Sequence, residues 1–504
     1  MNTFLNGMKT TSNYTRTENG ALTHKTTMDG LMDLFAMGAA YRSRTDEDVM
    51  LLFKNAFDEN PVYALKCLFY IRDVRGGQGE RRFFRVATKY LASYNPDAMR
   101  RNLQYVPEFG RWDDLFVFIG TPLETDALNI VKHQLALDVQ CKTPSLLGKW
   151  MPSENTSSQK TRKTAAKVRK FIGMTPKQYR KTLSVLRARI NVLERLMAEG
   201  RWDEIEFDKI PSKAGLKYKN AFARHDIERM KRNPEVKTYE AFAKDTETKV
   251  NAKALYPYEV VAKALTAYHR PMDDTDRLMV NKYWENLQNY FNGKSFNGLA
   301  VVDTSASMTW HGGEATPLNV AISLGLYCAE RANGPFANHY VSFSRTPRLV
   351  ETNGVDFCDK VYRIYRTNLC ENTNIEATFD MLLQTALNNG CGQDELPQNI
   401  IVISDMEFDQ GTGHGYGYDR SSWNPKTLME GIREKWARHG YRMPKIIYWN
   451  VDARQNNIPE DIGVGDISYV SGMSAAIFDT ILSGKTGYEL MMEKLNSPRY
   501  EVIR

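Results

Sequence analysis

Long hydrophobic runs are absent from this 504-residue sequence. No stretch approaches the roughly 18 to 20 apolar residues that cross a bilayer, so we expect no membrane-spanning helix. The N-terminal residues, Met1 to Tyr14, are polar and lack the charged-then-apolar order of a secretory signal. The six cysteines form no C-x-x-C pair, which argues against a zinc knuckle or a redox motif. A chain of this length needs no disulfides, and a reducing compartment fits it better. We therefore expect a soluble cytoplasmic protein without a membrane partner.

Familiar catalytic motifs are also missing. The eight histidines are scattered, and neither H-E-x-x-H nor G-x-S-x-G occurs. Two segments, 293–295 and 484–486, resemble the end of a phosphate-binding loop, but Gln288 and Asp479 stand where that loop requires glycine. We predict a protein without catalytic residues. Hydrolysis by a metal-bound water is the alternative that these absences leave open.

The positive charge is concentrated in one segment. Apolar residues make up 42% and charged residues 25% of the chain, as in ordinary globular proteins, and the formal net charge is only +7. Thirteen Lys or Arg residues lie between Lys142 and Arg189, where Glu154 is the only acid. This segment therefore carries a charge of +12, and the rest of the chain sums to −5.

The basic segment has the pattern of helices rather than of a disordered tail. Thr175-Pro176 is a helix-start signal, and apolar residues recur at helical spacing from Leu183 to Met197. A solvated helix face is the ordinary fate of charge, but dense charge of one sign repels itself unless a polyanion lies nearby. We favour RNA or another polyanion over a plain solvated face. The predicted RNA-binding residues are Lys160, Arg162, Lys163, Lys167, Arg169, Lys170, Lys177, Arg180, Lys181, Arg187 and Arg189.

Two domains are predicted, covering residues 1–295 and 296–504. The first reads as helices in series, for example around Ala64 to Ile71 and Phe83 to Leu91, separated by the glycine-rich segment 75–79. Such helices suggest a HEAT-like helical array. In the second domain, short apolar strands (299–302, 339–343, 400–403, 446–449 and 467–470) alternate with helices (318–332, 374–389, 426–439 and one opening at Ser474). This alternation predicts an α/β fold with a doubly wound, mostly parallel sheet.

Oxygen-bearing side chains gather at the predicted strand ends. Asp303, Ser305 and Ser307 follow the first strand, Asp405 ends the 400–404 strand, and Thr373 precedes a helix. Ligands of doubly wound sheets bind at the carboxyl ends of strands, and oxygen ligands suit hard divalent cations. A hydrogen-bonded turn without metal is the alternative interpretation of the two serines. The neighbouring carboxylates, Glu407 and Asp409, are most simply interpreted as solvated.

The spacing Asp303-x-Ser305-x-Ser307, with Thr373 and Asp405, resembles the metal-ion-dependent adhesion site of von Willebrand factor A domains. The resemblance covers residues 296 to 504. It implies Mg²⁺ or Mn²⁺ held directly or through water by Asp303, Ser305, Ser307, Thr373 and Asp405, with one open position for a partner's carboxylate. The loop before the family's threonine is commonly glycine-rich, whereas this chain has Glu371, which could crowd the metal or occupy the open position.

The whole chain resembles the Ro ribonucleoprotein family, whose helical part is the TROVE module, and more closely a set of relatives with the same layout. Four segments carry this resemblance: 72–81, 110–115, 147–152 and 404–409. It implies a ring of helical repeats closed by the metal-site domain, with single-stranded RNA ends in the hole and structured non-coding RNA outside. The expected function is a non-catalytic RNA-binding protein, acting as a ribonucleoprotein scaffold or in RNA quality control. An adaptor that grips an acidic protein through the metal is the alternative, and a metal-dependent hydrolase is a weaker one.

Overall fold

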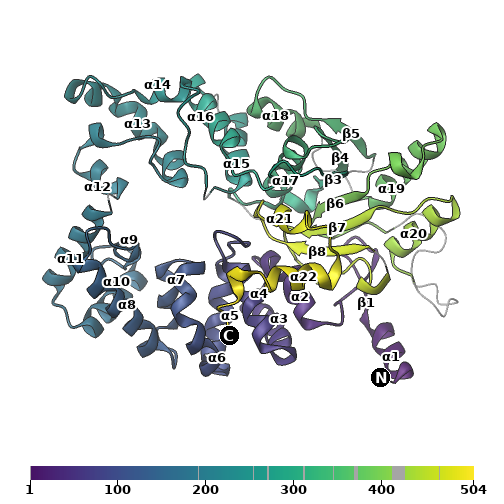
Figure 1. Ribbon diagram of the computed structural model, residues 1–504, viewed down its shortest axis with the longest axis horizontal. Coiled ribbons are helices and arrows are strands. Elements are labelled where there is room, and N and C mark those ends of the chain that lie inside the picture. The colour runs from purple at the N-terminus through teal and green to yellow at the C-terminus, as the bar shows by residue number, and fades with distance from the viewer. Residues whose placement is uncertain are drawn as a thin grey trace. The chain divides into compact units, whose positions relative to one another are not determined.

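The computed structural model describes residues 2–190, 192–253, 255–269, 272–309, 313–343, 346–367, 373–410, 426–464 and 466–504. The chain forms two compact units, each assembled from several segments (Figure 1). The sheet unit comprises Met1–Cys67, Leu255–Asp273 and Leu287–Ser497. The helical unit comprises Leu68–Ala254, Asp274–Asn286 and Pro498–Arg504. The first 67 residues thus pack with the sheet, so the compact units do not follow one cut near residue 295.

The sheet unit is built on a six-stranded sheet of order β5-β4-β3-β6-β7-β8. Its strands are β3 (Gly298–Asp303), β4 (His339–Phe343), β5 (Arg348–Glu351), β6 (Asn399–Ser404), β7 (Lys445–Asn450) and β8 (Ile467–Ser471). All neighbours are parallel except the β4–β5 pair. The five predicted strands and the mostly parallel sheet are confirmed. The antiparallel edge strand β5 was not predicted, because three of its four residues are exposed and it lacks a buried apolar run.

Helices cover this sheet, and they come from both ends of the chain. Helix α17 packs against β3, β4 and β6, whereas α2 and α22 pack against β8 (Figure 1). The helices of the unit are α1 (Thr3–Asn13), α2 (Gly30–Met37), α3 (Asp46–Glu59), α15 (Pro257–His269), α17 (Pro317–Arg331), α18 (Phe357–Thr367), α19 (Ile375–Asn389), α20 (Leu428–Arg438), α21 (Ile477–Ile481) and α22 (Gly487–Leu495). The helix that was predicted to begin at Ser474 is in fact two helices, α21 and α22, and the first of them begins at Ile477.

The N-terminal region contains a hairpin where only helices were expected. Strands β1 (Tyr14–Arg16) and β2 (Leu22–His24) pair antiparallel, with Tyr14 opposite His24. Gly20 lies in the connecting turn with a φ of 91°, which favours glycine. A distant segment stabilises the hairpin, since the backbones of His24 and Ile458 donate hydrogen bonds to each other. Those partners are more than 400 residues away, so local periodicity could not reveal it.

The helical unit is built from helices. They are α5 (Arg82–Tyr94), α6 (Pro96–Asn102), α7 (Val106–Phe109), α8 (Glu124–Gln140), α9 (Leu147–Trp150), α10 (Gln159–Ile172), α11 (Pro176–Arg189), α12 (Leu193–Ala198), α13 (Ser212–Arg232), α14 (Tyr239–Lys244) and α16 (Asp274–Glu285). Helix α4 (Pro61–Arg72) contributes its last residues to this unit. The predicted helical N-terminal part with a following α/β part is confirmed.

The basic segment forms two capped helices. Ser158 caps the start of α10, and Gly173, in the left-handed conformation, ends it. Thr175 caps α11 in a reciprocal box with Gln178, and Pro176 follows at the first helical position, so the predicted start is confirmed. The apolar spacing that runs to Met197 does not form one helix, because α11 ends at Arg189 and α12 begins at Leu193.

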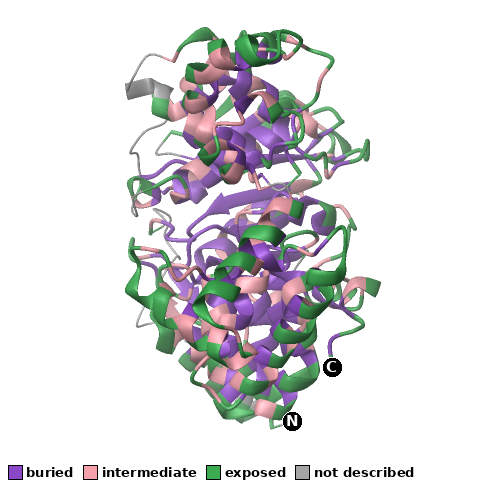
Figure 2. Ribbon diagram, turned by 90° about the vertical axis from the view of Figure 1, so that its left-hand side faces the viewer, coloured by how far each residue is buried: buried purple, intermediate pink, exposed green. Residues whose placement is uncertain are grey.

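Burial separates the apolar interior of each unit from a polar surface (Figure 2). Every residue of β3 is buried, as are five of the six residues in both β6 and β7. Among the described residues, no helix is both long enough and apolar enough to span a membrane. The five described cysteines form no disulfide.

Candidate functional site

The sheet unit brings the predicted acidic residues to the edge between β3 and β6. Asp303 ends β3 and Asp405 directly follows β6, and these two strands are parallel neighbours. The chain continues from β3 to β4 on one side, while β6 lies on the other, so this is the point where the strand order reverses. Doubly wound sheets form their binding crevices at such a point.

The loop after β3 folds back on itself through its polar side chains. The Ser305 amide donates to Asp303 Oδ1 at 2.9 Å, and the Ser305 and Ser307 hydroxyls lie 2.9 Å apart. Asp303 Oδ2 accepts a hydrogen bond from the Ser404 hydroxyl at 2.5 Å. Asp303 is fully buried, and burial together with the charge of Asp405 raises the pKa of Asp303 to about 7.

Asp405 is held by three groups of different kinds. Its carboxylate accepts from the Glu407 amide at 3.2 Å and from Arg454 Nη2 at 3.1 Å, and Ser307 also bonds to it. Burial raises the pKa of Asp405, whereas Arg454 opposes that rise. The residue between Asp405 and Glu407 is Met406, with a φ of 64°, which is rare for a side chain with a Cβ.

The N-terminal segment lies along this loop. Thr17 Oγ1 donates to the Phe408 carbonyl, the Glu18 amide donates to Glu407 Oε2, and Asn19 Nδ2 donates to the Glu407 carbonyl. The same Asn19 amide lies 3.4 Å from the hydroxyl of Thr373. Residues 17–19 therefore cover the loop that carries Asp405 and reach one of the predicted metal ligands.

Thr373 belongs to the same neighbourhood. It is 1% exposed, and its carbonyl accepts a hydrogen bond from the Asp409 amide at 2.9 Å. Glu371, which could occupy an open metal position, lies outside the described residues. Across the described part of the chain, no three His, Cys, Asp or Glu side chains gather to hold a metal. A cation at this edge would therefore depend on hydroxyl ligands beside the two aspartates.

Three residues of this site were not predicted from the sequence. Arg454, Glu18 and Asn19 lie in loops far from the Asp303 and Asp405 motifs along the chain, and nothing in their local sequence marks them. Glu407 was interpreted as solvated, but it is fully buried, and burial raises its pKa to about 7. That interpretation is wrong because the N-terminal segment covers the loop.

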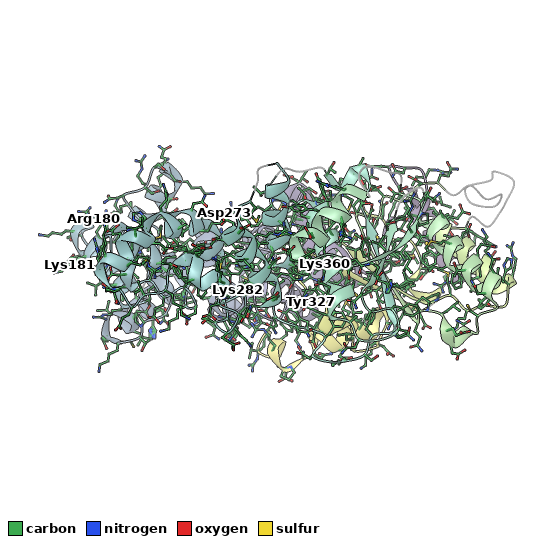
Figure 3. The ribbon with its side chains drawn as sticks, turned by 90° about the horizontal axis from the view of Figure 1, so that it is seen from above. Arg180, Lys181, Asp273, Lys282, Tyr327 and Lys360 are labelled. Carbon is green, nitrogen blue, oxygen red and sulfur yellow. The ribbon has the colours of Figure 1, made fainter. Side chains whose placement is uncertain are left out.

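The predicted RNA-binding residues divide into two groups. Arg187 donates to the carbonyls of Gly148 and Met151 and to Ser153, and Arg189 donates to the carbonyls of Val139 and Cys141 at the end of α8. In addition, Arg169 pairs with Glu154, and Lys167 pairs with Glu124. These four side chains therefore have partners within the helical unit, although Lys167 and Arg189 are also exposed. The remaining seven are exposed on α10 and α11, where Figure 3 shows Arg180 and Lys181 next to each other; they are Lys160, Arg162, Lys163, Lys170, Lys177, Arg180 and Lys181.

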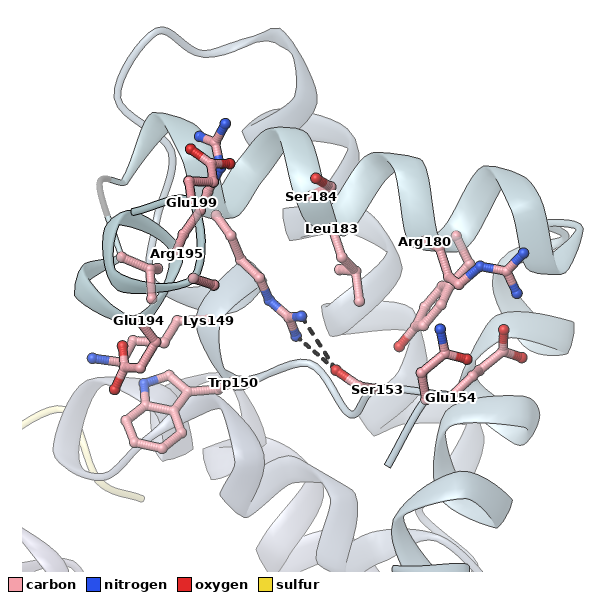
Figure 4. Close-up of a pocket in the computed structure, with 15 residues that line it drawn as sticks. Lys149, Trp150, Ser153, Glu154, Arg180, Leu183, Ser184, Glu194, Arg195 and Glu199 are labelled. Carbon is pink, nitrogen blue, oxygen red and sulfur yellow. Dashed lines mark hydrogen bonds and ion pairs between the residues drawn. The ribbon is translucent and has the colours of Figure 1, made fainter. Parts of the chain in front are cut away.

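A cavity of about 650 Å³ opens beside this surface (Figure 4). Its walls come from α9, the segment after it, α11 and α12. Gly148 permits the close approach of α9 to α11, since a Cβ there would lie 2.8 Å from the Cβ of Leu186. Trp150 lines the cavity, and the guanidinium carbon of Arg111 lies 3.9 Å from the centre of its ring.

Two of the segments that resemble the Ro family form a buried ion-pair cluster. Arg72, which is 2% exposed, pairs with the fully buried Asp114 at 2.8 Å. Arg85 pairs with Asp113 and Asp114, and Arg111 also pairs with Asp113. The GRWDD segment at 110–114 therefore supplies the counter-charges of Arg72 and Arg85.

The fold defines a class of protein in which a helical part is combined with an α/β part built on a mostly parallel six-stranded sheet. The model for "Domain of unknown function (DUF2828)" matches residues 17–167 and 148–292, so the chain belongs to the DUF2828 family. The model for "Domain of unknown function (DUF7788)" matches residues 297–500.

The chain is similar to two other proteins along most of its length. It is 29% identical over 511 residues to uncharacterized protein L728 of Acanthamoeba polyphaga mimivirus, covering 94% of this chain and 85% of that one. The crystal structure of the Deinococcus radiodurans Ro (RSR) protein matches with a TM-score of 0.50 and 16% identity, covering 93% of this chain and 99% of that one. The similarity to the Deinococcus radiodurans structure supports the overall fold described above.

Proposed function

We propose that this protein binds RNA through the exposed lysines and arginines of α10 and α11, and that it does so without catalysis. The observation that carries the proposal is the set of seven exposed cations on two consecutive helices, from Lys160 to Lys181. The only acid between Lys142 and Arg189 is Glu154, which is already paired with Arg169. A phosphate backbone is the kind of partner that relieves such charge. The resemblance to Ro proteins points the same way, toward single-stranded ends and structured non-coding RNA.

Salt dependence of RNA binding is the direct test. Charge reversal of Arg162, Lys163 and Lys170 should weaken binding to RNAs of unrelated sequence. The slope of log affinity against log salt should become shallower by about 2, since each phosphate contact contributes about 0.7 for single strands. The matched control reverses three exposed lysines elsewhere in the helical unit, Lys89, Lys231 and Lys253. Equal loss in both triple variants, or none in either, would contradict the proposal.

We also propose that the sheet edge holds Mg²⁺ or Mn²⁺ through Asp303, Ser305, Ser307, Thr373 and Asp405. The donor set fits a hard cation, because all its side-chain ligands are oxygens. Burial raises the pKa values of both carboxylates, and the charge of Asp405 adds to the rise at Asp303. A bound cation would lower the cost of keeping both carboxylates charged. Bound metal would act as a Lewis acid toward an oxygen ligand from a partner. The chain's own residues would orient that partner and exclude water.

Thermal unfolding with and without the ion tests the metal site. Mg²⁺ or Mn²⁺ should raise the melting temperature of the wild type, and Asp303→Asn should abolish this rise. Asp394→Asn, at an exposed acidic position of the same unit, is the control. A metal-induced rise that persists undiminished in Asp303→Asn would place any bound ion elsewhere.

The second candidate function is an adaptor that grips an acidic protein through the metal. The buried Asp303 and Asp405 pair favours it, because a metal there could accept a partner's carboxylate. Pull-down from nuclease-treated cell extract separates the two functions, since an adaptor keeps its protein partners without RNA. Within the RNA-binding proposal, a cytoplasmic ribonucleoprotein scaffold or a role in RNA quality control fits best. Hydrolysis would instead predict turnover that Asp303→Ala abolishes.

A further inference from the structure

The cavity between α9, α11 and α12 has the size of a ligand site. Its volume of about 650 Å³ lies within the roughly 300–1,000 Å³ of pockets for small molecules. The lining includes the apolar side chains of Leu183 and Val192 and the hydroxyls of Ser153 and Ser184; Leu183 and both serines are labelled in Figure 4. A ligand with a flat ring and polar groups at its edge could contact both the apolar side chains and the hydroxyls of this lining.

The charges in the cavity wall are largely compensated within the protein. The Arg187 guanidinium donates hydrogen bonds to the carbonyls of Gly148 and Met151 and to the hydroxyl of Ser153. Arg195 pairs with Glu199 at 2.7 Å. Glu154 is paired with Arg169 at 2.7 Å. The interior therefore offers no concentrated positive charge to a phosphate, in contrast to the surface of α10 and α11 outside it.

Trp150 gives the cavity an aromatic wall in a defined position. The ring is partly exposed, Arg111 lies 3.9 Å from its centre, and Lys149 lies 5.7 Å from it. Arg111 is itself fixed by its ion pair with Asp113. An aromatic ring held in this way is a platform on which a nucleobase can stack.

Exposed cations lie on the α11 wall of the cavity. Arg180 lines the cavity, and its neighbours on α11, Lys177 and Lys181, are exposed. We propose that this cavity receives one unpaired nucleobase of a bound RNA, with Trp150 as the stacking wall and the α11 cations holding the adjacent phosphates. The inference rests on the proposed RNA-binding function and adds a preference for single strands, since a paired base is already stacked inside its duplex.

Fluorescence anisotropy with the full-length protein tests this proposal. The probes are a labelled single-stranded RNA of about 12 nucleotides without self-complementarity and a blunt duplex of the same length. Trp150→Ala should weaken single-strand binding about tenfold and leave duplex binding within about twofold. Ser184→Leu should do the same by filling the cavity from an exposed position, without removing a contact of Trp150.

Two controls make the outcomes distinct. Tyr94→Ala removes an exposed aromatic ring elsewhere in the helical unit and should leave both affinities unchanged. Trp150→Phe keeps a stacking ring and should retain most of the single-strand affinity. Wild-type affinity of both Trp150→Ala and Ser184→Leu for the single strand would overturn the base pocket alone. Absence of binding to either RNA by the wild type would overturn the proposed function and the pocket with it.

Discussion

The guanidinium of Arg454 lies 3.1 Å from a carboxylate oxygen of Asp405, and its other terminal nitrogen lies 2.7 Å from Glu18. One cation thus joins the acidic strand edge to the N-terminal segment of the same unit. Asp405 is 1% exposed, so Arg454 stabilises its charge in a place where water cannot solvate it. A divalent ion at this edge would share Asp405 with Arg454.

Replacing Arg454 by methionine should destabilise the metal-free sheet unit. The expected loss in the free energy of unfolding is about 3 kcal/mol, because a buried carboxylate would lose its counter-charge. Urea denaturation followed by circular dichroism measures it, and added Mg²⁺ should restore part of the loss. The comparison variant is Arg438→Met at a 75% exposed side chain, which should change the free energy by less than about 0.5 kcal/mol. Equal effects of the two variants would contradict this role of Arg454.

The metal-induced stabilisation should depend on pH. Burial and the charge of Asp405 raise the pKa of Asp303 to about 7, above the ordinary value of 3.8. The folded state therefore binds a proton that the unfolded state has lost, and the metal-free stability should fall as pH rises from about 4 to about 7. Mg²⁺ competes with that proton, so the rise in melting temperature caused by Mg²⁺ should grow over the same range. Melting curves at several pH values measure both trends, and Asp303→Asn should weaken them. A metal effect independent of pH would argue against Asp303 as a ligand.

The ion-pair cluster of the helical unit should be essential for stability. Arg72→Met leaves the fully buried Asp114 with Arg85 as its remaining cationic partner, so we expect a loss of about 3 kcal/mol. Urea denaturation monitored by tryptophan fluorescence reports it. Arg101→Met, at an exposed arginine of the same unit, should have an effect below about 0.5 kcal/mol. Wild-type stability of Arg72→Met would show that the pair contributes no net stabilisation.

Gly148→Ala should open the contact between α9 and α11. The added Cβ would lie 2.8 Å from the Cβ of Leu186, which is buried, so the helices must separate. The expected cost is about 1–3 kcal/mol, as for other overpacked cores. Thermal melting measures it, and Gly7→Ala, where nothing lies within 4 Å of the new Cβ, should cost nothing measurable. An unchanged melting temperature would mean that the helices adjust without strain.

The order of elements and the acidic strand edge could be predicted from the sequence. Apolar runs such as Ile400 to Ile403 become central strands because they are buried on both faces. Asp303 and Asp405 follow two such runs, and parallel strands present their carboxyl ends at one edge. Positions at the ends of neighbouring strands can therefore be inferred from the order of elements alone.

The roles of individual charges could not be predicted in the same way. Arg187 and Lys181 look alike in a count of basic residues, yet Arg187 is bonded to the backbone of the α9 region and Lys181 is exposed. The same holds for Arg72, which is buried against Asp114, a residue 42 positions further along the chain. A charge's environment depends on partners distant in sequence, and local patterns do not contain them.

By itself, the sequence determined the fold class, the capped helices of the basic segment and the positions of Asp303 and Asp405, because burial periodicity, capping residues and strand ends are local properties. Only the tertiary structure decided which cations remain exposed, how α9, α11 and α12 enclose a cavity beside Trp150, and that Arg454 and residues 17–19 cover the acidic edge. Each of these depends on contacts between segments tens to hundreds of residues apart, which form only when the chain has packed.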